Sequence, residues 1–122
     1  MIKTKIKSIV NTREAMQRLA QQTLPVAVSY RVTKLIRAID AELAVYDKER
    51  IRLCEKYGKL NESKTSYAIL KGAEFNEEHS LLLDFDIELD VQKVKLPETL
   101  NITPADLLCL SEFVEIEGVS DD

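Results

Sequence analysis

The sequence predicts a single α+β domain over residues 1–122, built around one long central amphipathic helix. Three observations predict this class. Residues 2–10 and 87–96 alternate apolar and polar side chains, as half-buried strands do. From about 26 to 57, apolar residues recur at spacings of three and four, the period of a helix. Near the carboxyl end, Thr103-Pro104-Ala105-Asp106 combines a helix cap, a proline at the first helical position and an acid at the third.

The other helices and the sheet are predicted from local patterns in the sequence. Three shorter helices are expected, over about 12–22, over 73–85 and from Thr103 onward, with a small, mainly antiparallel sheet. Asn11 and Glu14 form a capping-box pattern before the first of them. Phe75, Leu82 and Phe85 are expected to point inward from the second.

The remaining segments are shorter. A polar loop over 59–65 precedes a short strand at 66–70. The strand at 87–96 is expected to carry a bulge at 92–93, where its alternation slips. Residues 114–116 are expected to close the chain as an edge strand.

The long helix predicts self-association. A helix from 26 to 57 measures about 48 Å at 1.5 Å per residue, whereas a compact chain of this length is roughly 35 Å across. One end should therefore project from the globule or pack against another copy. We predict a homo-oligomer whose interface includes Tyr46, Leu53 and Tyr57, where the apolar stripe runs toward the far end of the helix.

The charges are divided along the chain. Residues 1–71 hold 15 Lys and Arg against 7 Asp and Glu, and residues 72–122 hold 2 against 14. Attraction between the halves, within one fold or between copies, explains this better than a nucleic-acid partner, which the acidic half would repel. No apolar run approaches the ~20 residues that a membrane span needs. Cys54 and Cys109 are expected to be buried thiols rather than a disulfide.

A search for catalytic chemistry finds little. The one histidine, His79, stands among acids and is expected at the surface; no glycine-rich phosphate loop is present. The acids Asp84, Asp86, Glu88 and Asp90 have the spacing of one strand face, which suits a hard cation but equally a solvated surface. We therefore expect no enzyme activity, no metal and no cofactor.

One cluster of residues is a candidate ligand site. Arg31, Lys34 and Arg37 follow one another at steps of three on the long helix, with Tyr30 adjacent. Such a row suits a phosphate-bearing small molecule, with the tyrosine stacking on a base. The competing interpretation is a solvated face that docks against the acidic half of the chain.

Two stretches of the sequence resemble a known group of proteins. Residues 24–35 begin with Leu24-Pro25-Val26 and lead along the long helix to Tyr57-Gly58, and residues 102–108 include Pro104-Ala105-Asp106-Leu107. This order resembles a group of small proteins of unassigned role encoded by tailed phages and prophages, over about half of the chain. The resemblance implies action in the cytoplasm of an infected bacterial host, or in the virion. It assigns no functional residue.

Two functional hypotheses result. The first is a non-catalytic, oligomeric accessory or assembly factor that acts through protein–protein interaction. The second is a counter-defence sponge that sequesters a nucleotide-derived host immune signal, bound by Tyr30, Arg31, Lys34 and Arg37.

Overall fold

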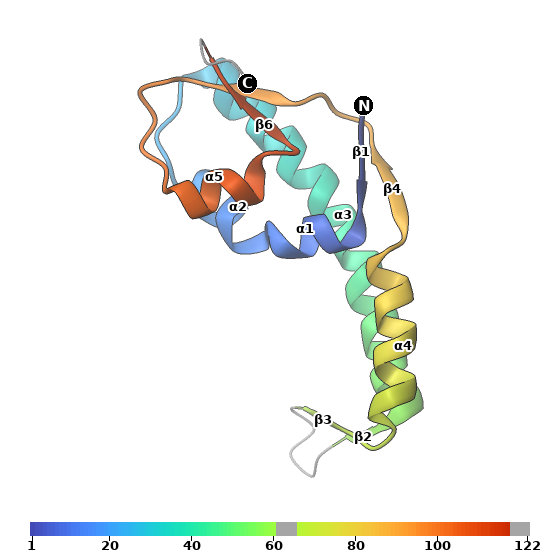
Figure 1. Ribbon diagram of the computed structural model, residues 1–122. Helices are drawn as coiled ribbons and strands as arrows, with labels where there is room; N and C mark the ends of the chain where they lie inside the picture. Colours follow the sequence, from blue (N-terminus) through green and yellow to red (C-terminus); the bar gives the residue numbers. More distant parts are fainter. Residues whose placement is uncertain (61–65, 118–122) are drawn as a thin grey trace.

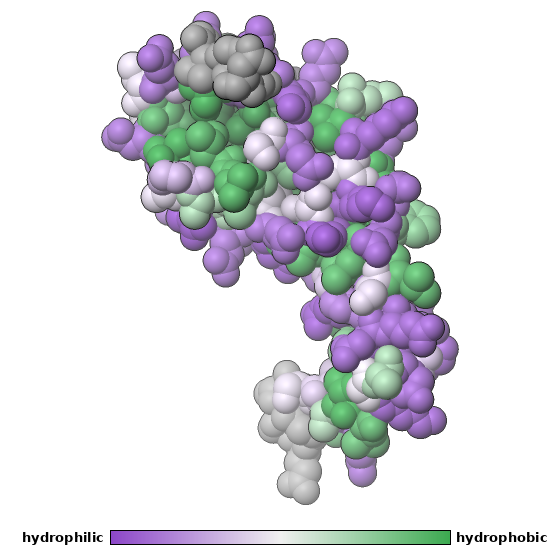
Figure 2. All heavy atoms as spheres, in the orientation of Figure 1, coloured by the Kyte–Doolittle hydropathy of each residue, from purple (hydrophilic) through white to green (hydrophobic). Residues whose placement is uncertain are grey.

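The computed structural model describes residues 1–60 and 66–117, and it confirms the α+β class. Figure 1 and, in the same orientation with all heavy atoms, Figure 2 show a body from which an arm projects. The elements of the body are β1 (Ile2–Lys5), α1 (Ile6–Asn11), α2 (Arg13–Ala20), the first half of α3 (Val26–Tyr57), β4 (Asp86–Leu89), β5 (Val94–Leu96), α5 (Pro104–Leu110) and β6 (Val114–Ile116). The arm consists of the second half of α3 with β2 (Gly58–Leu60), β3 (Tyr67–Ile69) and α4 (Gly72–Leu83).

Helix α3 has the bounds that its periodicity predicts, and it connects body and arm. Its N-cap is Pro25, and its predicted stripe is buried at Val32, Leu35, Ile39, Leu43 and Tyr46. Figure 1 shows the first half crossing the body and the second half projecting from it. The projection is what the mismatch between helix length and globule diameter predicts. Helix α4 packs beside the projecting half, and the two form a helical hairpin closed by β2 and β3.

The core lies in the body, where the largest fully buried side chains are Phe113, Ile9, Leu35, Ile39, Leu96 and Leu110. Helix α5 begins as predicted: the Thr103 hydroxyl accepts a hydrogen bond from the Asp106 backbone N–H at 3.2 Å. Arg18 of α2 donates to both carboxylate oxygens of Asp106, at 2.7 and 2.5 Å. This forked pair fixes α2 against α5.

Within residues 1–60 and 66–117 the strands form three separate two-stranded sheets. β1 pairs with β4 and β2 with β3, both antiparallel, whereas β5 and β6 are parallel. The single bulged strand expected over 87–96 is therefore wrong, because its two halves belong to different sheets. Leu89 is buried in β4 opposite Ile2, while Val94 donates its backbone N–H to Phe113 at 3.1 Å. The final strand at 114–116 is confirmed.

The secondary structure of residues 2–11 differs from the prediction. The strand expected to reach Val10 ends at Lys5, and Ile6–Asn11 form a helix. Ile6, Ile9 and Val10 also have helical spacing, and Ile6 and Ile9 are buried on one helical face. The predicted capping box does not form. Thr12, not Asn11, is the N-cap of α2, and its side chain makes no capping hydrogen bond. The Thr12 hydroxyl donates instead to the Cys109 carbonyl at 3.1 Å. The described residues thus hold four shorter helices rather than three.

Two side chains of the carboxyl half are more exposed than predicted. Helix α4 ends at Leu83, so Phe85 lies beyond it and remains 63% exposed instead of pointing inward. Cys109 is exposed on α5, so the prediction of two buried thiols holds only for Cys54; neither cysteine forms a disulfide. The expected strand at 66–70 is present as β3. The polar loop expected over 59–65 lies, from residue 61 on, outside the described residues.

Candidate functional site

Two of the four residues of the predicted ligand site line a hollow. This hollow, about 450 Å³ in volume, lies between the first half of α3 and residues 90–95; we call it the cationic hollow. Arg31 and Lys34 contribute from α3, and Lys93 and Lys95 contribute from the other side. Tyr30 is 63% exposed, and the Lys34 ammonium lies 5.3 Å from the centre of its ring. The structure therefore brings two predicted cations together with two that the sequence did not indicate.

Arg37 does not line the cationic hollow. A step of three residues falls about 60° short of a full turn of an α-helix, so a row at steps of three winds around the axis. By the time the row reaches Arg37 it has turned about 120° from Arg31. Arg31 and Lys34 do lie beside residues 90–95 of the acidic half. In residues 1–60 and 66–117, however, no ion pair joins Arg31, Lys34 or Arg37 to a carboxylate.

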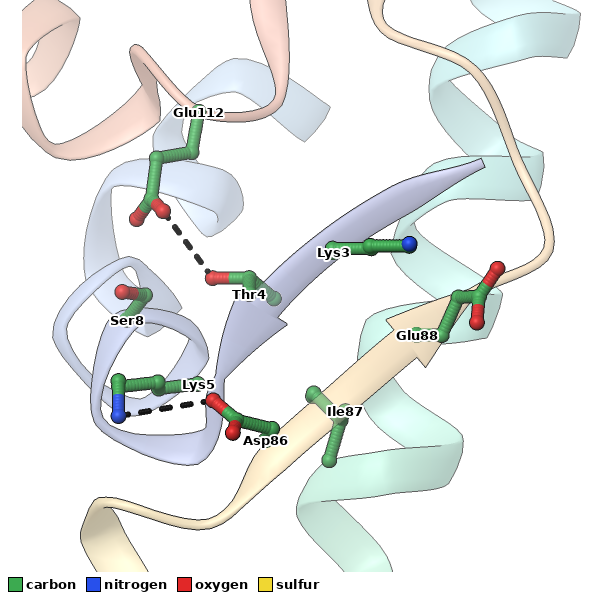
Figure 3. A pocket seen from close by; sticks show the side chains of 8 residues that line it. All are labelled: Lys3, Thr4, Lys5, Ser8, Asp86, Ile87, Glu88 and Glu112. Carbon is green, nitrogen blue, oxygen red and sulfur yellow. Dashed lines mark hydrogen bonds and ion pairs between the residues drawn. The ribbon is translucent and has the colours of Figure 1, made fainter.

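A second hollow, of about 570 Å³, lies over the β1–β4 ladder and is shown in Figure 3. Its charges compensate one another. The Lys5 ammonium lies 3.5 Å from an Asp86 oxygen, and the Thr4 hydroxyl donates to Glu112 at 3.2 Å. Glu88 is the cross-strand neighbour of Lys3. Cross-strand pairs of opposite charge stabilise a ladder, so two members of the acidic series, Asp86 and Glu88, have a structural explanation.

The joint between α3 and α4 holds a small polar cluster. The Tyr46 hydroxyl and His79 Nε2 are 2.8 Å apart, and the His79 ring stacks on Phe75 with centroids 5.5 Å apart. Burial raises the pKa of Tyr46. His79 is thus half-buried and hydrogen-bonded, not the surface histidine that the sequence suggested. Tyr46 was predicted to lie in the oligomer interface. Its side chain is only 5% exposed, because other residues of the same chain cover it.

A third hollow lies between the two helices of the arm, and we call it the arm groove. Leu53, Leu81 and Leu82 form its apolar part; Glu49, Arg52, Lys56 and Glu78 form its charged edge. Leu81 is 67% exposed. Of the predicted interface residues, Leu53 lines this groove. Tyr57 is half-buried at the tip, where its carbonyl accepts backbone hydrogen bonds from Leu70 and Lys71.

Within the described part of the chain, no three side chains of His, Cys, Asp or Glu lie close enough to hold a metal ion. None of the helices in that part has both the length and the apolar composition of a membrane span.

Comparison with known proteins gives no match to a protein family, to a curated protein or to a solved structure. The candidate sites therefore stand on their geometry. Sequence reasoning missed Lys93, Lys95 and Leu81. The two lysines could have been noticed as the only Lys or Arg residues after position 71. Leu81 had no distinguishing signal, because a leucine in a helix is usually a core residue.

Proposed function

We propose that this chain is a non-catalytic binding protein that pairs with a second copy of itself through the arm groove. The observation that supports this proposal is the exposure of α4. No residue of Gly72–Leu83 is buried, and Leu81 stands open beside the groove. A short helix is marginal in water unless packing stabilises it. Helix α3 packs on one side of α4 and leaves no α4 residue fully buried. A second surface over the side that carries Leu81 would add to that packing.

Charge complementarity favours a second copy as the occupant. Glu74, Glu77, Glu78 and Leu81 have the spacing that places them on one face of α4. Across the groove, α3 contributes Arg52 and Lys56. Within one chain Arg52 pairs with Glu49 at 2.8 Å and Lys56 with Glu78 at 3.4 Å. A two-fold axis would bring the acidic face of one copy to these pairs in the other and let the ions exchange partners, and the same contact would form twice.

The groove also has the composition of an interface. Leucines form its centre and charged residues its edge, as in many protein–protein contacts. Burying the exposed part of a leucine side chain contributes about 1–2 kcal/mol. The symmetric contact buries two copies of Leu81, one from each chain.

Paired variants test this proposal. Leu81→Asp places two carboxylates in the interface and should weaken association at least about a hundredfold, since burying an unpaired charge costs several kcal/mol. Leu108→Asp is the matched control, because Leu108 is 76% exposed on α5, in the body. Sedimentation velocity should show a dimer for the wild type and the control, and a monomer for Leu81→Asp. Dissociation of both variants, or of neither, would refute the arm groove as the interface.

The resemblance to phage proteins supports a proposal about the wider role. This resemblance favours an accessory or assembly factor that acts in an infected bacterial cell or in the virion. A second candidate, favoured by the cationic hollow, is sequestration of a nucleotide-derived host signal. Capture from infected cells, with Leu81→Asp as the comparison, separates these roles: the accessory role predicts a co-purifying protein that the variant loses.

A further inference from the structure

The cationic hollow gathers four positively charged side chains from two distant segments of the chain. Arg31, Lys34, Lys93 and Lys95 line it, and the one carboxylate among its lining residues belongs to Asp90. Within residues 1–60 and 66–117, none of these four cations forms an ion pair. Elsewhere in the body, cations such as Arg13 and Lys5 lie within 4.0 Å of a carboxylate.

Regular secondary structure fixes where these cations point. On α3, Val32 and Leu35 are buried, so the neighbouring Arg31 and Lys34 face outward. β5 alternates buried and exposed residues, and Lys95 faces outward between two buried neighbours. The contact between α3 and β5 then brings both sets of cations to one hollow.

The two lysines of the hollow come from the half of the chain that is otherwise acidic. Residues 72–122 contain 14 Asp and Glu and only two Lys or Arg residues, Lys93 and Lys95. The fold places both of them beside Arg31 and Lys34, although attraction between the halves would favour acids there. Like charges held together destabilise a fold. A bound anion would remove that cost.

We infer that the cationic hollow binds a small phosphate-bearing molecule. An arginine binds phosphate oxygens through a fork of two N–H groups, and lysines supply point charges. A volume of about 450 Å³ is within the range of small-molecule sites and accommodates a nucleotide or a polyphosphate. Tyr30 is exposed next to Lys34 and offers a ring for stacking. The site is in the body and does not depend on the arm groove, so either proposal can fail alone.

A small molecule fits the hollow better than a nucleic acid. The chain carries a net charge of −4, and its acidic half adjoins the hollow. A long polyanion would extend beyond four cations into that field, whereas a small ligand would not.

Titration of the full chain with pyrophosphate, followed by amide NMR, tests the inference. The largest shifts should occur at residues 31–34 and 92–95. Arg31→Gln combined with Lys95→Gln should weaken binding at least about tenfold, the effect of losing charge-assisted contacts. Arg37→Gln is the control for Arg31→Gln alone, since each removes one positive charge from α3 and only Arg31 lines the hollow; Arg37→Gln should bind as the wild type does.

Three results would overturn the inference. The control could weaken binding as much as Arg31→Gln does, which would indicate diffuse attraction. The shifts could center elsewhere in the chain. A short single-stranded oligonucleotide could bind the same residues more tightly than pyrophosphate, which would make the site a nucleic-acid surface.

A stability measurement adds a readout that a purely structural role of Lys95 would not produce. In buffer without phosphate, Lys95→Gln should raise the melting temperature, because it relieves repulsion among the four cations. An unchanged or lowered melting temperature would contradict the like-charge argument. Pyrophosphate should raise the melting temperature of the wild type more than that of Lys95→Gln.

Discussion

Gly58 joins α3 to β2, and replacing it with alanine should loosen the tip of the arm. A Cβ atom at this position would lie 2.7 Å from the Ala68 carbonyl oxygen and 2.8 Å from that of Cys54. Both oxygens belong to the backbone and cannot rotate away. The φ angle of Gly58 is −139°, which any residue adopts. The glycine is therefore required for space and not for its backbone conformation.

The size of the effect follows from this collision. Overpacking of a well-packed site costs about 1–3 kcal/mol, so local opening of the arm should become about five- to a hundredfold more frequent. Gly72→Ala is the matched control, because a Cβ there has nothing within 4 Å. Gly72 is the first residue of α4, where alanine should be neutral or stabilising by up to about 1 kcal/mol.

Hydrogen exchange resolves this difference locally. Amides of the β2–β3 ladder and of α4 should exchange faster in Gly58→Ala, while those of the body should change little. Gly72→Ala should leave the same amides as protected as in the wild type, or more so. If the two alanine variants behave alike, the steric account of Gly58 is refuted.

Three further predictions concern stability. Phe113→Ala should lower the free energy of unfolding by about 3–5 kcal/mol, because this side chain is 0% exposed in the core; urea unfolding with less than about 1 kcal/mol of loss would contradict this placement. The Arg18 hydrogen bond lowers the pKa of Asp106 below its ordinary value of 3.8. The pair therefore stabilises the fold above that pH, and this stabilisation is lost as pH falls through the lowered pKa of the folded state. In acid titrations followed by circular dichroism, Asp106→Asn should therefore lack part of the wild-type decline below about pH 4, and identical curves would exclude a role for the pair. Tyr46→Phe should cost about 1 kcal/mol in urea unfolding, because it leaves His79 without its 2.8 Å partner, and an unchanged midpoint would show that the bond contributes nothing.

The sequence predicts best the elements whose signals are long or redundant. Helix α3 repeats its apolar spacing over many turns, and α5 carries the cap at Thr103, with Pro104 at the first position. Both have the predicted start. Residues 2–10 were ambiguous because Ile2, Ile6 and Val10 satisfy a period of two while Ile6, Ile9 and Val10 satisfy a helical one. Burial in the core decided it, since Ile6 and Ile9 are both buried on one face of α1.

Pairing between distant segments lay beyond the sequence pattern. Alternation around Leu89 and Val94 indicates strands, but it does not say that they belong to different sheets. The same limit applies to the candidate site. Arg31 and Lys34 could be identified from one helix, whereas Lys93 and Lys95 join them only because β5 packs on α3.

Self-association through the arm is the central claim, and native mass spectrometry of the wild-type chain tests it most directly. One chain has a mass of 13.9 kDa. A dimer joined through the arm groove should appear as a principal species of twice that mass, and Leu81→Asp should return it to the mass of a single chain. A wild type that remains at 13.9 kDa over the full range of workable protein concentrations would contradict self-association through the arm.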